Sequence, residues 1–269
     1  MTSSVSFQLT VAETAFMFQL MGIPEGETML EDFGAAKAEN VPPEEFYRNA
    51  KKNLEDAGLL QSDGNHITFE LSILDHLKAC KYSSASVRLE VHGTDGESSI
   101  TYAFISGSQV VEMRWNSKTG DVILTSLGEG FEEQLSRIGD RLPLPDTEEG
   151  SYRILMRSET LKRLQEQFGS ADPAMHQAVL RNDTWADVQA AGALIEAFCS
   201  VDQWGIFETA IRGTEIRSKP VQFIGSPAGH WLFMQEEGDR VQGFQITKTE
   251  LIQSLYLVAK RTLSIFAPD

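Results

Sequence analysis

The residues best suited to chemistry in this sequence are five histidines and two cysteines: His66, His76, His92, His176, His230, Cys80 and Cys199. A structural zinc site usually takes four nitrogen or sulfur ligands, and no two of these histidines have the spacing of a metal-binding pair. His76 and Cys80 would share one face of a helix, but no second pair accompanies them. We therefore predict no metal site. Two cysteines are too few for a disulfide framework, so we expect packed, reduced thiols and leave any redox role open.

Motifs for nucleophilic or phosphate chemistry are also missing from the pattern. The segment Gly225 to Gly229 resembles a nucleophile elbow only in its glycines, because Pro227 stands at its centre and the flanking stretches are both strand-like. There is no glycine-rich phosphate loop and no dinucleotide-binding fingerprint. Acidic pairs such as Glu132-Glu133 are sequence neighbours, so a helix or strand sends their carboxylates in different directions. The sequence predicts no catalytic residue and no cofactor.

The elements that would carry a site form a repeat. Residues 100–138 read as strand, turn, strand, turn, strand and helix, and residues 221–258 follow the same order. Apolar residues recur with the period of two that half-buried strands require, and glycine-containing turns separate the strands. A Ser/Thr-x-x-Glu pattern then predicts a capped helix in each copy, at Ser126 to Glu129 and at Thr247 to Glu250. We interpret the repeat as an old duplication.

The fold class that follows is α+β, with two pseudo-symmetric halves around a central sheet. Each half is predicted to hold a helical region, an antiparallel β-meander and a final helix. Cys80 and Cys199 support this division, since each ends a helix-like run just before a strand-like one. The predicted boundaries are a first half at 1–138 with its meander at 100–125, a Pro-containing acidic linker at 139–150, and a second half at 151–269 with its meander at 220–246.

The start of the first half has the outline of a winged-helix module. Residues 1–9 are polar, and we predict no element there. A capping box at Thr10 opens a helix that ends near Met21, and Pro43 begins a second helix. A hairpin that turns at Asp63-Gly64 follows. Acidic residues offset the basic ones on the second helix, so the likeness concerns the fold and not DNA binding.

The charge of the chain disfavours two classes of partner. Its 269 residues carry 39 acidic and 23 basic side chains, which gives a net charge of −16. A field of that sign repels the phosphate backbone of nucleic acids and anionic membrane surfaces. No secretory signal opens the chain, and no apolar run is long enough to span a membrane. We predict a soluble cytoplasmic protein that binds neither nucleic acid nor membrane.

The order of elements resembles that of the EspG family, the cytosolic chaperones of ESX-type (type VII) secretion systems. The resemblance runs from about Thr10 to Leu263 and lies in the sequence of helices, meander and final helix, repeated once. No diagnostic motif matches, so no residue role is carried over. The resemblance implies a non-enzymatic chaperone or adaptor with a quasi-two-fold fold, which grips the tip of a helical-hairpin substrate through an exposed loop and the sheet face.

The predicted contact sites for such a helical protein partner are the hairpin turns of the two meanders. Tryptophans make good interface anchors when they are exposed. The candidate protein-binding residues are Trp115, Lys118 and Asp121 in the first meander and Trp231, Gln235 and Arg240 in the second. Two alternatives stay open: a winged-helix-related regulator or scaffold that acts through protein assembly, and an enzyme with an unrecognised site. The oligomeric state is not predicted.

Overall fold

The computed structural model describes residues 5–26, 33, 43–64, 66–129, 142, 144–147, 150, 152–181, 183, 187–212 and 218–264. Over these residues the fold is α+β, as the sequence predicts. Ten strands follow one another in the hydrogen-bonded order β1-β7-β6-β5-β4-β9-β10-β11-β12-β8, and β2 and β3 form a separate hairpin. The chain falls into two compact units, one made of residues 1–86 and 99–134 and the other of residues 87–98 and 135–269.

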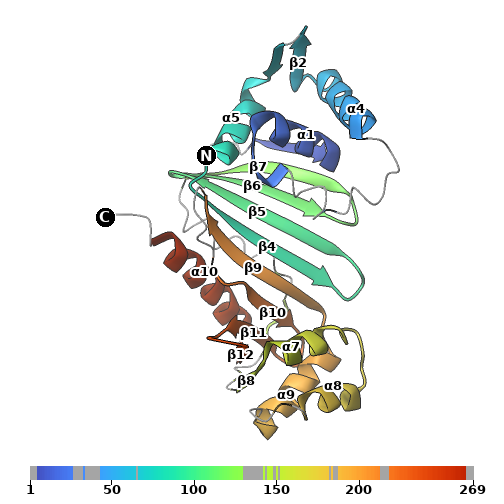
Figure 1. Cartoon of the computed structure of the whole chain (residues 1–269), viewed down its shortest axis with the longest axis vertical. Helices are drawn as coiled ribbons and strands as arrows, with labels where there is room; N and C mark the ends of the chain where they lie inside the picture. Colours follow the sequence, from blue (N-terminus) through green and yellow to red (C-terminus); the bar gives the residue numbers. More distant parts are fainter. Residues whose placement is uncertain are drawn as a thin grey trace. The chain divides into compact units, whose positions relative to one another are not determined.

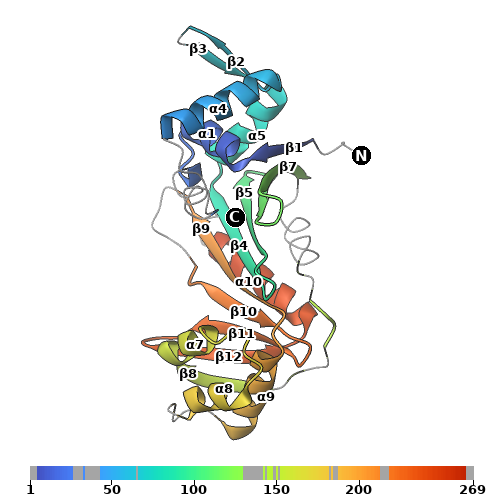
Figure 2. The same ribbon diagram turned by 90° about the vertical axis from the view of Figure 1, so that its right-hand side faces the viewer.

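Unit 1 alternates helices with the strands of the first meander. Its elements are β1 (Ser6–Thr10), α1 (Val11–Met21), α4 (Pro43–Asp56), β2 (Leu60–Asp63), β3 (His66–Phe69), α5 (Leu71–Lys81), β5 (Ser98–Ser106), β6 (Gln109–Asn116) and β7 (Asp121–Glu129). Figures 1 and 2 show the α4 helix and the β2–β3 hairpin beside α1 and α5. The predicted capping box of α1 is confirmed, because Thr10 accepts from the Glu13 amide and Glu13 accepts from the Thr10 amide.

The core of unit 1 forms where α1 and α5 pack on the meander. Phe18 of α1 meets Phe104 of β5 edge to face, with ring centroids 6.0 Å apart. Ile73, Leu77 and Cys80 are spaced three or four residues apart on α5, and all three are buried in the same core. The apolar stripe read from the sequence is therefore the packing face of the helix.

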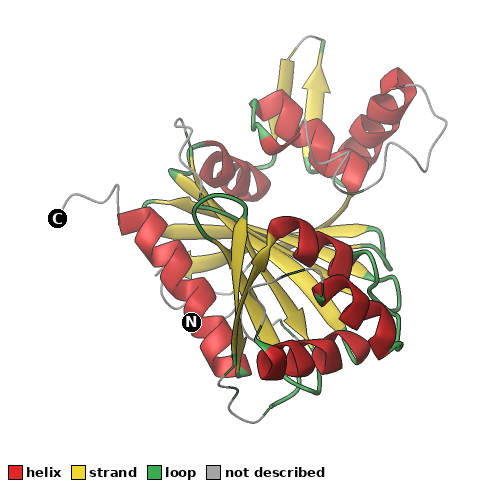
Figure 3. Ribbon diagram, turned by 60° about the horizontal axis from the view of Figure 1, so that its bottom comes forward, coloured by secondary structure: helices red, strands yellow, loops and turns green. Residues whose placement is uncertain are grey.

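Unit 2 holds the second meander and most of β4 (Ala85–Gly93), which begins in unit 1. Its other elements are β8 (Arg153–Arg157), α7 (Ser158–Gln165), α8 (Pro173–Leu180), α9 (Val188–Cys199), β9 (Gln203–Ile211), β10 (Val221–Gly225), β11 (His230–Gln235), β12 (Arg240–Ile246) and α10 (Lys248–Ser264). Within this unit, Figure 3 shows α10 on one side of the strands and α7, α8 and α9 on the other. The capping box that opens α10 at Thr247 is confirmed by the reciprocal bonds with Glu250.

The period of two in β9 decides which face of the sheet is closed in unit 2. Gln203, Gly205, Phe207, Thr209 and Ile211 are buried, whereas the residues between them are half-buried. The register pairs Gly205 with Phe223 and Phe207 with Val221, so these side chains share the closed face. The opposite face is covered by α9 near β8 and β10 and is half-open along β4 and β9.

Two expectations about unit 1 are corrected by the structure. Residues 6–10 form a strand, β1, that pairs with β7 in the register Ser6↔Thr125 to Thr10↔Asp121. Because β7 continues through Ser126 to Glu129, where it pairs with β6, the predicted capping box there does not form. The final helix predicted for the first half, at residues 131–138, lies outside the described residues.

Candidate protein-binding surface

The half-open face of unit 2 carries an unusual run of charged residues on a strand. Val87, Leu89 and Val91 alternate on β4 with Arg88, Glu90 and His92, so the three polar side chains share one face. The side chains of Arg88, Glu90 and His92 are 23%, 17% and 26% exposed. They are thus partly withdrawn from water but reachable from it.

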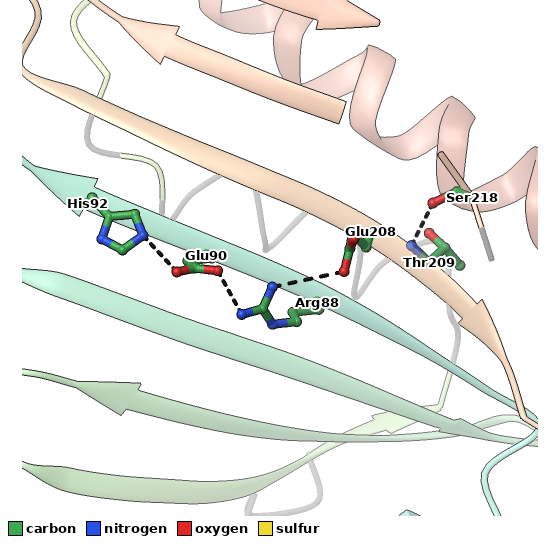
Figure 4. A network of polar contacts seen from close by, with 6 residues as sticks. All are labelled: Arg88, Glu90, His92, Glu208, Thr209 and Ser218. Carbon is green, nitrogen blue, oxygen red and sulfur yellow. Dashed lines mark hydrogen bonds and ion pairs between the residues drawn. The ribbon is translucent and has the colours of Figure 1, made fainter. Parts of the chain in front are cut away.

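These side chains form one connected network, which Figure 4 shows in close view. The Arg88 guanidinium lies with Nη2 2.7 Å from Glu90 Oε2 and Nη1 3.9 Å from Glu208 Oε2 on β9. His92 Nε2 lies 2.7 Å from the other Glu90 oxygen, Oε1. Charge-assisted bonds of this kind fix both partners, so Glu90 is held at both oxygens. Thr209, whose amide is bonded to Ser218 Oγ, belongs to the closed face.

The environment of Glu90 favours its charged form. The hydrogen bond from His92 lowers the pKa of Glu90 most, and the positive charge of Arg88 lowers it further. Burial works in the opposite direction but does not outweigh these partners. The network therefore presents an ionised carboxylate between two basic side chains at neutral pH.

An aromatic stack adjoins the network. The His92 ring lies on Trp204 with centroids 4.0 Å apart and planes 18° apart. Trp204 stacks on Phe168 at 5.7 Å, and Phe168 stacks on Phe198 of α9 at 5.2 Å. Trp204 is half-buried, so the stack runs from the half-open face to the core of unit 2. Together, Arg88, Glu90, His92, Trp204 and Glu208 make a rigid polar and aromatic platform, which we call the β4–β9 platform.

The predicted anchor tryptophans do not meet the condition of exposure. Trp115 is 8% exposed and stacks on Phe33 with ring centroids 5.0 Å apart. Trp231 is fully buried in the core under α9. Both residues lie on strands that pack against helices, so their side chains stabilise the fold and are closed to a partner.

The other predicted contact residues lie at or beside the hairpin turns. In unit 1, Asp121 accepts from Gln8 Nε2 at 2.8 Å, and the Lys118 amide donates to Asn116 Oδ1. In unit 2, Gln235 Nε2 donates to the carbonyl of Gly238 at 3.0 Å, and Arg240 is exposed. The two turns belong to different units, and each is a separate candidate surface.

The β4–β9 platform was missed by sequence reasoning although a signal for it exists. The residues Arg88, Glu90 and His92 alternate with aliphatic residues in a strand, and a strand that faced water on its polar side would look the same. The pattern on β4 gives no indication of Trp204 and Glu208, which lie more than 100 residues further along the sequence. Only the neighbouring position of β4 and β9 in the sheet brings these residues together.

His76 and Cys80, the pair on one face of α5, have structural roles. His76 Nδ1 lies 2.8 Å from the Ser72 carbonyl oxygen and Nε2 lies 3.3 Å from that of Val5. Cys80 is buried in the core of unit 1. Within the described ranges, no group of three or more His, Cys, Asp or Glu side chains is placed to hold a metal ion. None of the described helices is long and apolar enough to cross a membrane.

Comparison with known proteins finds a similar fold among the solved structures. No protein-family model matches the chain, and no curated protein matches it. The structure is similar to that of EspG5, a chaperone of the type VII secretion system of Mycobacterium tuberculosis, solved in complex with the PE25–PPE41 dimer. The TM-score is 0.63 and the identity 11%, and the match covers 96% of each chain. The resemblance to EspG chaperones that the order of elements predicts is therefore confirmed at the level of the fold.

Proposed function

We propose that this chain is a non-enzymatic chaperone or adaptor that binds a helical protein substrate of an ESX-like (type VII) secretion system in the cytoplasm. The observation that carries the proposal is a fold similar to EspG5 over 96% of the chain. The β4–β9 platform adds a physical reason. Its charged side chains are already paired and its rings are already stacked. These side chains would therefore lose little conformational freedom when a partner binds.

The chemistry of the platform fits a protein partner. Interface centres favour aromatic residues and arginine, which offer large contact area and several hydrogen-bond donors. Trp204 and Arg88 supply both on one face, and Glu208 offers a carboxylate that is 32% exposed. The hairpin residues Lys118, Asp121, Gln235 and Arg240 would add polar contacts at their own turns.

A duplication of one ancestral half is proposed as the origin of this fold, with halves at 1–138 and 151–269 and a linker between them. The strand order supports it. The order β1-β7-β6-β5-β4 places the opening strand of the half beside its last strand, and β8-β12-β11-β10-β9 does the same. Each opening strand also leads directly into a helix, α1 or α7.

The proposal is tested by co-purification with the PE25–PPE41 dimer and with proteins captured from the source cell. Replacing Trp204 by Ala and Arg88 by Glu should weaken recovery of a bound substrate at least tenfold, because both changes remove a central contact. Leu257→Ala is the matched control, since Leu257 is exposed on α10. Charge reversal at Lys118 and Arg240 tests the hairpins separately. Equal recovery by the platform variants and the control would remove the platform from the proposal.

A further inference from the structure

A cleft of about 270 Å³ opens in unit 2 between α7 and strands β10 to β12, on the side of the sheet that carries α7. Figure 2 shows α7 beside β11 and β12. The floor of the cleft is apolar, because Leu161, Phe233 and Val241 line it and are almost fully buried. Its volume lies below the roughly 300 to 1,000 Å³ of pockets that enclose drug-sized ligands. The space suits one large apolar side chain with its adjoining backbone.

The rim of the cleft offers hydrogen bonds of both kinds. Gln165 Nε2 donates to Gln222 Oε1 at 2.8 Å. This bond leaves Gln165 Oε1 to accept and Gln222 Nε2 to donate, which is the pair of groups that a peptide unit matches with its N–H and C=O. At the other end, Ser158 Oγ lies 3.3 Å from Gln235 Oε1 and closes the rim.

The charge at the mouth of the cleft is opposite to that of the whole protein. Lys162 is the one ionisable residue among the described residues that line it, and it is exposed. The chain as a whole has a net charge of −16. A ligand that enters the cleft therefore meets an apolar floor, a peptide-like rim and an ammonium group at the mouth.

We propose that this cleft binds an apolar side chain of a partner protein whose next residue is acidic, with the carboxylate at Lys162 and the backbone at Gln165 and Gln222. The inference rests on the proposed function as a protein-binding chaperone and names the chemistry of one contact. The glutamine pair selects peptide over a purely apolar ligand, and Lys162 selects an acidic neighbour over a basic one.

The test uses the full chain and three blocked hexapeptides, Ac-GSFEGS-NH2, Ac-GSFKGS-NH2 and Ac-GSGEGS-NH2, titrated to millimolar concentration by two-dimensional NMR. The Phe-Glu peptide should give saturable shifts of the side-chain amides of Gln165 and Gln222. The Phe-Lys peptide should bind about two- to fivefold more weakly, as expected for an exposed ion pair. The Gly-Glu peptide should give no saturable shift, because it lacks the group that fills the floor.

A charge swap gives the sharper result. Lys162→Glu should reverse the preference, so that the Phe-Lys peptide binds more tightly than the Phe-Glu peptide. Arg163→Glu is the matched control, because it makes the same change in charge one residue further along α7, where the side chain pairs with Glu159 and does not line the cleft. This control should keep the order of the wild type, and circular dichroism should show both variants folded.

Several outcomes would overturn the inference. Equal binding of the Phe-Glu and Phe-Lys peptides, an unchanged order in Lys162→Glu, or shifts that map outside the cleft would each do so. Saturable binding of octanoate with no binding of any peptide would assign the cleft to small amphiphilic acids. If the peptides fail while a protein substrate still co-purifies through the β4–β9 platform, only this inference falls. If co-purification fails as well, the proposed function falls separately.

Discussion

At the scale of single residues, Glu90 is the clearest case of a side chain whose state is set by its surroundings. Arg88 and His92 hold its two oxygens, and their combined effect lowers its pKa. A carboxylate whose pKa is lower in the folded chain than in the unfolded chain stabilises the fold at neutral pH. This contribution is complete above the ordinary value of 4.5 and is lost as the pH falls through the lower folded value.

Glu90→Gln should therefore lower the free energy of unfolding at pH 7 by about 1 kcal/mol, since a neutral amide makes weaker bonds to both partners. The difference from the wild type should shrink as the pH falls below the ordinary pKa of 4.5. Urea unfolding at several pH values measures this. Glu237→Gln, in the exposed turn after β11, is the control and should leave stability at pH 7 unchanged. A pH-independent loss in Glu90→Gln would assign its role to packing alone.

Gly205 is a second residue whose identity is set by its surroundings, because a side chain there has no room. A Cβ atom there would lie 2.4 Å from the Glu90 carbonyl oxygen and 2.4 Å from the Phe223 ring. Gly205→Ala should lower the free energy of unfolding by about 1 to 3 kcal/mol, the usual cost of overpacking. Gly192→Ala, inside α9 with open space around the new atom, should instead raise it by about 0.5 to 1 kcal/mol. Thermal unfolding of both variants checks the contrast, and equal shifts would contradict it.

At the scale of elements, local signals are read correctly where local bonds decide the outcome. The capping boxes of α1 and α10 are examples, because all their bonds lie within four residues. The pattern from Ser126 to Glu129 matches the same capping motif, but these residues form a strand. There β7 continues as a strand paired with β6, and the Ser126 amide donates to the carbonyl of Val5. A partner so distant in the sequence leaves no local trace.

The cap of α10 can be tested directly. Thr247→Ala removes the oxygen that accepts from the Glu250 amide, so it should destabilise the protein by about 1 kcal/mol. Thr249→Ala, two residues further on, is the matched control and should cost less than half as much. Chemical unfolding of the two variants measures the difference. The same cost for both would show that the cap contributes nothing beyond helix propensity.

The linker predicted at 139–150 contains buried side chains that its composition does not indicate. Leu142 and Leu144 are buried, and the Pro145 carbonyl lies 2.9 Å from Nε2 of the buried His230. The proline and acidic residues that suggest a solvated connection are thus interspersed with side chains that pack in unit 2. Burial lowers the pKa of His230, which keeps its ring neutral and able to accept from the Ser226 amide.

At the scale of the whole molecule, the α+β class and the EspG-like fold could be predicted from the sequence, because they follow from the periodicity and order of its elements. The proposed binding surface could not be predicted in this way. Trp115 and Trp231 are candidates by residue type alone, and the structure buries both, whereas the β4–β9 platform depends on strands that meet only in the sheet. Composition alone cannot tell a core tryptophan from an exposed one.

The central claim is that this protein acts by binding another protein. The most direct measurement is affinity capture of the tagged full chain from a native lysate of its source cell, with mass spectrometry of what is recovered, run beside the Trp204→Ala, Arg88→Glu double variant. We expect the wild type to recover a helical secretion substrate in stoichiometric amount and the double variant to recover at least tenfold less. Recovery of no stoichiometric protein by the wild type, or of nucleic acid in its place, would contradict the claim.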